Sequence, residues 1–100
     1  MNPVSMQLVT IIAEHVLREP IAADLRRLGA RGYSVGEVEG EGTRGVHAQD
    51  WQGRNLRFET VVTREVAGRI MDHLAGTYFH DYAVIAYATT VEVVRSEKFT

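Results

Sequence analysis

The order of apolar and polar residues changes period along the chain. Gln7–Ala13 is almost continuously apolar, which is typical of a strand buried on both faces. From Leu17 to Leu28, leucine or isoleucine recurs after four, four and three residues, so this segment is predicted to be a helix with one buried face. Pro20 is tolerated in the first turn of a helix, and Gly29 is a natural residue at its end.

Two further strands are predicted around the middle of the chain. Tyr33–Glu39 has the composition of a strand, and Gly36 within it indicates a bulge or a close backbone approach. In Leu56–Val62 apolar and polar residues alternate, which predicts a strand with one buried face.

A second helix and a last strand complete the pattern. Thr63 can cap the helix at its amino end. The apolar stripe of this helix consists of Val66, Ile70 and Leu74, with Met71 beside it. Ala83–Ala88 is a strongly apolar strand, and Val91–Val94 is either its extension or a short fifth strand.

The order strand–helix–strand–strand–helix–strand predicts a single α+β domain over residues 1–100 with the ferredoxin-like arrangement. Residues 40–55 form a connection far longer than a hairpin requires, and such loops are usually functional or disordered. The tail at 95–100 is polar and is expected to be loose.

Composition narrows the class of protein. The chain has 100 residues, a formal net charge of −2 and no cysteine, so disulfides and thiol chemistry are excluded. A net negative charge gives no basis for nucleic-acid binding. The amino terminus lacks a signal-peptide pattern, and no apolar run approaches the roughly 20 residues that span a membrane. A cytoplasmic protein is expected.

The glycine-rich stretch Gly40–Gly45 reads G-E-G-T-R-G. It has the spacing of a dinucleotide-binding fingerprint, but that motif must open a helix, and residues 46–55 are polar without a helical period. The glycines expose backbone N–H groups that can surround an anion, and Arg44 can bind phosphate through two hydrogen bonds. The stretch therefore predicts a phosphate-binding loop.

Three segments together resemble PII-like signalling proteins, most closely the SbtB and carboxysome-associated branch. They are Gly29–Val35, the G-E-G-T-R-G loop and Tyr78–Ala83, and the resemblance extends over nearly the whole chain. It implies a homotrimer that binds an adenine nucleotide in each of three clefts between neighbouring subunits. The segment at 40–55 then corresponds to the family's T-loop, which contacts partners.

The resemblance also assigns residues to the nucleotide site. The base of the T-loop, near the phosphates, is matched by Gly40, Gly42, Arg44 and Gly45, with Thr43 among them. Ser34 matches a hydroxyl position near the adenine, and Glu59 and Val61 match the strand that lines the base. Tyr82 and Ala83 belong to the loop that the family calls the B-loop.

Two of the departures from PII proteins of nitrogen control concern the phosphates. Their B-loop carries T-G-x-x-G-D-G-K, whereas this chain has T-Y-F-H-D-Y at Thr77–Tyr82. Their paired arginines on the last strand are replaced by Val91–Val94, which reads V-E-V-V. Because positive charge is missing where further phosphates would extend, AMP or ADP is the expected nucleotide, with bicarbonate as a candidate second ligand.

The function implied is that of a non-enzymatic regulator of inorganic-carbon uptake or metabolism. It would act through the T-loop on a membrane bicarbonate transporter or a carbon-metabolism protein, which could hold it peripherally at the membrane. Trp51 and His47 are the candidate partner contacts, because an aromatic residue on a polar loop is a good interface anchor. Local packing is the alternative role for Trp51.

Two other functions are less well matched. An acylphosphatase-like enzyme would need a glycine-rich loop after the first strand, where this chain has Glu14–Leu17. An RNA-binding sheet would need aromatic and basic strand signatures, which are missing. The four histidines lack metal-ligand spacing, and no nucleophile elbow occurs, so neither a metal site nor a catalytic site is predicted.

Overall fold

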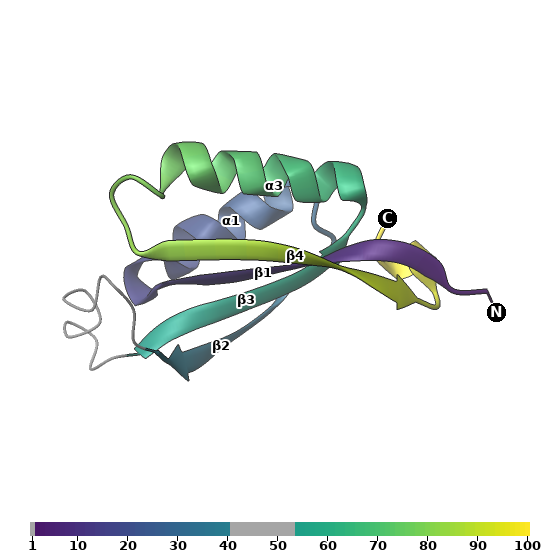
Figure 1. Cartoon of the computed structure of the whole chain (residues 1–100), viewed down its shortest axis with the longest axis horizontal. Helices are drawn as coiled ribbons and strands as arrows, with labels where there is room; N and C mark the ends of the chain where they lie inside the picture. Colours follow the sequence, from purple (N-terminus) through teal and green to yellow (C-terminus); the bar gives the residue numbers. More distant parts are fainter. Residues whose placement is uncertain (1, 41–53) are drawn as a thin grey trace.

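The computed structural model describes residues 2–40 and 54–100, which form a four-stranded antiparallel sheet with two helices on one face (Figure 1). The strands are β1 (Val4–Glu14), β2 (Ser34–Glu39), β3 (Arg54–Val62) and β4 (Val84–Val93). The helices are α1 (Arg18–Leu28) and α3 (Arg64–Thr77), and short 3₁₀ turns cover His15–Leu17 and Ser96–Lys98. The strand order β2-β3-β1-β4 confirms the predicted ferredoxin-like arrangement.

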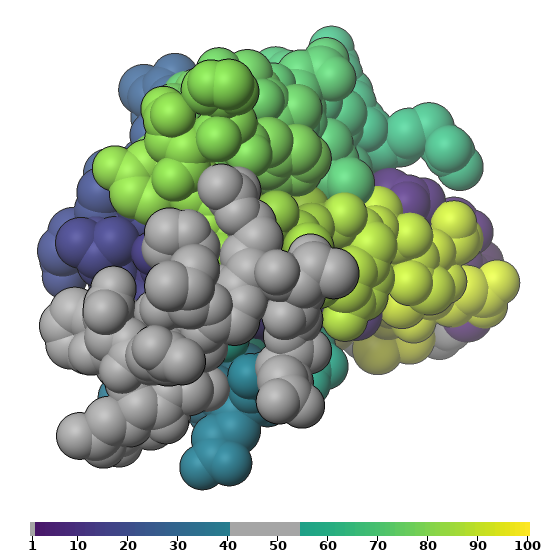
Figure 2. Space-filling view, turned by 60° about the vertical axis from the view of Figure 1, so that its left-hand side comes forward, coloured from purple at the N-terminus to yellow at the C-terminus, as the bar shows by residue number. Residues whose placement is uncertain are grey.

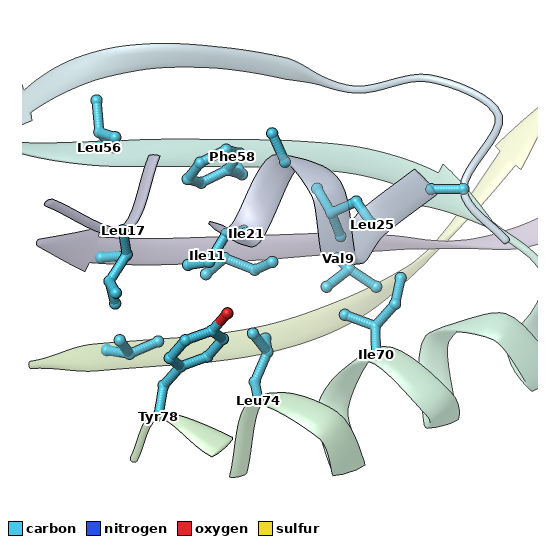
Figure 3. Packing of buried hydrophobic residues seen from close by; sticks show 14 of the residues in the cluster. Val9, Ile11, Leu17, Ile21, Leu25, Leu56, Phe58, Ile70, Leu74 and Tyr78 are labelled. Carbon is cyan, nitrogen blue, oxygen red and sulfur yellow. The ribbon is translucent and has the colours of Figure 1, made fainter. Parts of the chain in front are cut away.

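The core lies between the helices and one face of the sheet (Figure 3). Alternate residues of β1 and β3 point into it. The sequence predicts this alternation for β3, whereas it predicts a strand buried on both faces for β1. The sheet contributes Val9, Ile11, Ala13, Leu56, Phe58 and Val62, and the helices contribute Ile21, Leu25, Ile70 and Leu74. Ala67 is buried on α3, whereas Val66, predicted for the stripe, is only partly buried and lies against Gly29.

The helix boundaries follow the predicted signals. Gly29 ends α1 with φ of 117°, and the Ala30 N–H donates to the carbonyl of Leu25 at 2.9 Å. Thr63 precedes α3, and its Oγ1 accepts a hydrogen bond from the Val66 N–H at 3.2 Å. Each cap satisfies a backbone group that the end of the helix leaves without a partner.

The structure decides two alternatives that the sequence leaves open: the bulge at Gly36 is wrong, and the extension of the last strand is confirmed. Gly36 forms no bulge, because β2 pairs with β3 in one unbroken register from Ser34 opposite Glu59 to Glu39 opposite Arg54. No fifth strand follows β4, which pairs with β1 continuously as far as Val93 opposite Val4. The reason is that β1, with 11 residues, is long enough to pair with the whole of β4 in one ladder.

The tail at 95–100 begins with a local reversal of the chain. Arg95 adopts a left-handed conformation with φ of 59°, and a 3₁₀ turn follows at Ser96–Lys98. The guanidinium of Arg31 donates a hydrogen bond to the backbone carbonyl of Thr100. A local reversal and one long-range contact thus bring the tail back to the loop after α1.

The second face of the sheet carries apolar side chains without a covering helix. On this face Ile85 is 59% and Tyr87 is 47% exposed, and the neighbouring strand adds the half-buried Leu8 and Ile12. Figure 2 shows the atoms of β4 exposed over much of the strand below the helices. Within the described ranges, neither helix is long and apolar enough to cross a membrane.

Replacing Gly29 with alanine should destabilise the fold by about 1–2 kcal/mol, because the positive φ disfavours a side chain. A Cβ there would also lie 3.2 Å from Cγ2 of Val66. Urea unfolding measures the effect, with Gly32→Ala as the matched control, since a Cβ at Gly32 meets nothing within 4 Å. Equal stability of the two variants would contradict this account.

Candidate functional site

The described candidate residues fall into two groups at opposite ends of β2. Ser34 begins the strand and pairs with Glu59, and Val61 lies farther along β3. Gly40 directly follows the other end of β2. At about 3.3 Å per residue, Ser34 and Gly40 lie roughly 20 Å apart.

The B-loop candidates, Tyr82 and Ala83, join the Gly40 group. They directly precede β4, whose first residue, Val84, pairs with Ala13 of β1. Ala13 in turn pairs with Leu56 near the start of β3. The end of β2 and the starts of β3 and β4 therefore meet at the same edge of the sheet (Figure 1).

Ser34 and Glu59 of the first group line a groove of about 420 Å³ on the face of the sheet that no helix covers, and Val61 lies beyond its lining. The groove is lined by Ser34, Val35, Gly36, Glu37, Val38, Arg57 and Glu59. Gly36 leaves open space at its floor, since nothing lies within 4 Å of the position of a Cβ. The close backbone approach predicted for Gly36 is therefore not made by any described part of this chain.

Arg57, Glu37 and Glu59 are the charged residues that line this groove. The Arg57 Nη2 donates to the Glu59 Oε2 at 3.0 Å, and both side chains are substantially exposed. Exposed ion pairs of this kind contribute little to stability. Arg57 and Glu59 can therefore give up their mutual contact and bind a ligand or a neighbouring chain instead. The exposed hydroxyl of Ser34 adds a neutral donor and acceptor.

The second group is held by hydrogen bonds within the chain. The Tyr82 N–H donates to the carbonyl of Tyr78 at 2.9 Å, and the two rings meet edge to face at 6.1 Å. The Ala83 N–H donates to the Oε2 of Glu14 at 2.6 Å. The loop between α3 and β4 is thus a tight turn with a buried carboxylate beneath it.

A further polar cluster joins α1 to the end of α3. The Tyr78 hydroxyl donates to Oδ2 of Asp24 at 2.5 Å, and Nε2 of His73 lies 3.0 Å from the same oxygen. Arg27 Nη2 donates to Oδ1 of Asp24 at 3.3 Å. The sequence did not predict this cluster, because only the i, i+3 spacing of Asp24 and Arg27 is visible in it.

The cluster shifts the pKa values of two of its members. Burial raises the pKa of Asp24, but hydrogen bonds from Tyr78, His73 and Arg27 together outweigh it and leave the pKa below its ordinary value. Burial and the bond to Asp24 raise the pKa of Tyr78 well above its ordinary value near 10. Near neutral pH the pair is therefore a carboxylate and a neutral phenol.

Six predicted site residues lie outside the described ranges. They are Gly42, Thr43, Arg44, Gly45, His47 and Trp51. Their roles at the phosphates and at a partner stay predictions. Among the residues that the structure describes, no group of three or more His, Asp or Glu side chains could hold a metal ion.

Comparison with known proteins decides the family. The model for nitrogen regulatory protein P-II matches residues 6–98. The chain belongs to the P-II family. This assignment confirms the predicted resemblance to PII-like signalling proteins, without specifying a branch within them.

Solved structures agree with this P-II assignment. A PII-like signalling protein from Thermus thermophilus is 48% identical over 100% of both chains, with a TM-score of 0.86. CPII from Thiomonas intermedia, bound to ADP, AMP and acetate, is 20% identical over 99% of this chain and 98% of its own, with a TM-score of 0.86. CPII bound to ADP and bicarbonate is 21% identical over the same shares, again with a TM-score of 0.86. At such identities CPII shows only that the fold is shared.

Asp24 should stabilise the fold at neutral pH and lose this effect in acid. Because its pKa is lower in the folded chain than its ordinary value of 3.8, the stabilisation is present above about pH 4. It disappears as the pH falls through the folded-state pKa. We expect Asp24→Asn to cost roughly 1–3 kcal/mol at pH 7, with a smaller difference from the unsubstituted protein near pH 3.

Urea unfolding between pH 7 and pH 3 measures this difference. Asp72→Asn is the matched control, since Asp72 is exposed on α3. A difference between Asp24→Asn and the unsubstituted protein that stays constant over this range would show that Asp24 gains nothing from its charge.

Proposed function

We propose that this protein is a non-enzymatic signalling protein that binds an adenine nucleotide between neighbouring copies of itself. The observation that carries the proposal is the separation of the candidate residues into two groups. Ser34 and Gly40 are roughly 20 Å apart along β2. Two neighbouring chains that contribute one group each would bring the groups to a single ligand.

The uncovered face of the sheet supports such an assembly. A small domain buries a limited fraction of its surface, and exposed apolar patches mark interaction sites. Ile85 and Tyr87 form such a surface on β4, next to the half-buried Leu8 and Ile12 of β1. A homotrimer would cover this face and bring the groove on β2 and β3 of one copy to the strand ends of the next.

The groups within each cleft would divide the nucleotide between them. The groove with Ser34 and Glu59, together with Val61 farther along β3, would take the base. The edge with Gly40, Tyr82 and Ala83 would face the phosphates. Gly42, Thr43, Arg44 and Gly45 would complete the phosphate end through backbone N–H groups and the guanidinium. The T-loop would then transmit the identity of the ligand to a partner, with Trp51 and His47 as contacts.

Short nucleotides suit this site better than ATP. The loop at Tyr78–Ala83 lacks the glycines and lysine found in nitrogen-control PII proteins, and the last strand lacks their arginines. The structure of the relative CPII has been solved with ADP, AMP and bicarbonate. Its similarity to this chain by itself shows only that the fold is shared. We therefore propose AMP or ADP as the nucleotide and bicarbonate as a second ligand at the base of the T-loop.

Bicarbonate is a form of inorganic carbon, so the proposed ligands suit a regulator of inorganic-carbon uptake or metabolism. We place the protein with the SbtB and carboxysome-associated branch, acting on a bicarbonate transporter or a carbon-metabolism protein. An acylphosphatase-like activity is disfavoured, because a 3₁₀ turn without glycine, His15–Leu17, follows β1 where such an enzyme needs its anion loop.

The protein should be a stable trimer in solution, about three times the 11.2 kDa of one chain. The exposed apolar face of β1 and β4 is the physical reason. Light scattering at micromolar concentration measures the mass, and Tyr87→Glu should weaken the assembly by placing a charge on this face. A monomeric unsubstituted protein would refute the shared site along with the trimer.

Isothermal titration should show ADP or AMP binding at least as tightly as ATP with Mg²⁺. Arg44→Ala should lower the affinity for ADP by about 1.5–3 kcal/mol, the scale of a hydrogen bond to a charged group. Arg64→Ala, on the exposed first turn of α3, is the matched control. A tenfold preference for ATP with Mg²⁺, or unchanged affinity in Arg44→Ala, would contradict the proposed phosphate end.

A further inference from the structure

Glu14 is a buried carboxylate at the edge of the sheet where the phosphates are proposed to lie. It is the last residue of β1, and only 9% of its surface is exposed. Burying a charge is costly unless the group gains strong hydrogen bonds. The Ala83 N–H supplies one such bond to Oε2 at 2.6 Å.

Glu14 lies between the two segments that are proposed to hold the phosphates. Its partner across the ladder is Asn55 on β3, and Nδ2 of Asn55 lies 4.0 Å from where a Cβ of Gly40 would stand. On the other side, β4 begins directly after Ala83. Glu14 therefore lies between the start of the T-loop and the loop that precedes β4.

A backbone N–H on a tight turn is the kind of donor that binds phosphate oxygens. In this chain a carboxylate oxygen already occupies the position that an anion would take at the Ala83 N–H. A further phosphate would have to displace this bond, and it would approach a fixed negative charge. Placing like charges side by side is unfavourable.

We infer that Glu14 is a specificity-determining residue of the proposed nucleotide site, which limits the number of phosphates that the site accepts. The inference rests on the proposed function. Glu14 acts as an internal anion at the Ala83 amide, so the chain carries its own counterpart of a terminal phosphate. Nucleotides with fewer phosphates then avoid the repulsion.

The test is isothermal titration of AMP, ADP and ATP against the unsubstituted trimer and Glu14→Gln. Glutamine keeps the shape and an oxygen that can accept the Ala83 N–H, but it removes the charge. We expect the ratio of ATP affinity to ADP affinity to rise by about tenfold, with AMP affinity changed by less than about twofold. A merely structural role would move all three affinities together.

Two variants serve as controls. Glu65→Gln makes the same chemical change on the exposed first turn of α3, at the other end of that helix from Ala83, and should leave every affinity unchanged. Glu14→Asp keeps the charge and should keep the preference for few phosphates. Circular dichroism and light scattering confirm that each variant folds and assembles.

The outcomes separate this inference from the proposed function. If the unsubstituted protein binds none of the three nucleotides, the proposed function is wrong and the inference falls with it. If it binds ADP but the ratio stays the same in Glu14→Gln, only the inference is overturned. An unsubstituted protein that favours ATP over ADP overturns the inference without any variant, so the test does not depend on how well Glu14→Gln folds.

Discussion

The antiparallel pairing of β3 between β2 and β1 is the constraint on which the rest of this structure depends. It makes β2 run parallel to β1 although the two strands never touch, so the end of β2 and the end of β1 lie at the same edge. Gly40 and Glu14 meet at this edge because of that register, and β4 adds Ala83 through its own pairing with β1. The other end of β2 is left to Ser34 and Glu59.

Two carboxylates hold the loop between α3 and β4 from different sides. Asp24 on α1 accepts the hydroxyl of Tyr78, and Glu14 on β1 accepts the N–H of Ala83. The loop therefore needs no glycine-rich sequence to keep its shape. The loop is instead a tight turn that rests on two carboxylates of the chain.

The proposed limit on phosphates follows from this turn. Its last N–H, at Ala83, is already bonded to Glu14, so a further phosphate would have to displace that bond. At the groove, Arg57 and Glu59 form an exposed ion pair, and Glu37 adds a second carboxylate. Selectivity in such a site comes from what the chain excludes as much as from what it contacts.

The sequence by itself determined the order of elements, because helix and strand periods, Gly29 and Thr63 are local signals that act within a few residues. It also carried the family resemblance, and with it the candidate residues Ser34, Gly40, Glu59, Val61, Tyr82 and Ala83. Only the tertiary structure decided that these residues form two groups at opposite ends of β2, since strand register depends on pairing between distant segments. Likewise, neither the bond from Ala83 to Glu14 nor that from Tyr78 to Asp24 was visible in the sequence, because their partners are 69 and 54 residues apart and meet only when the sheet and helices pack.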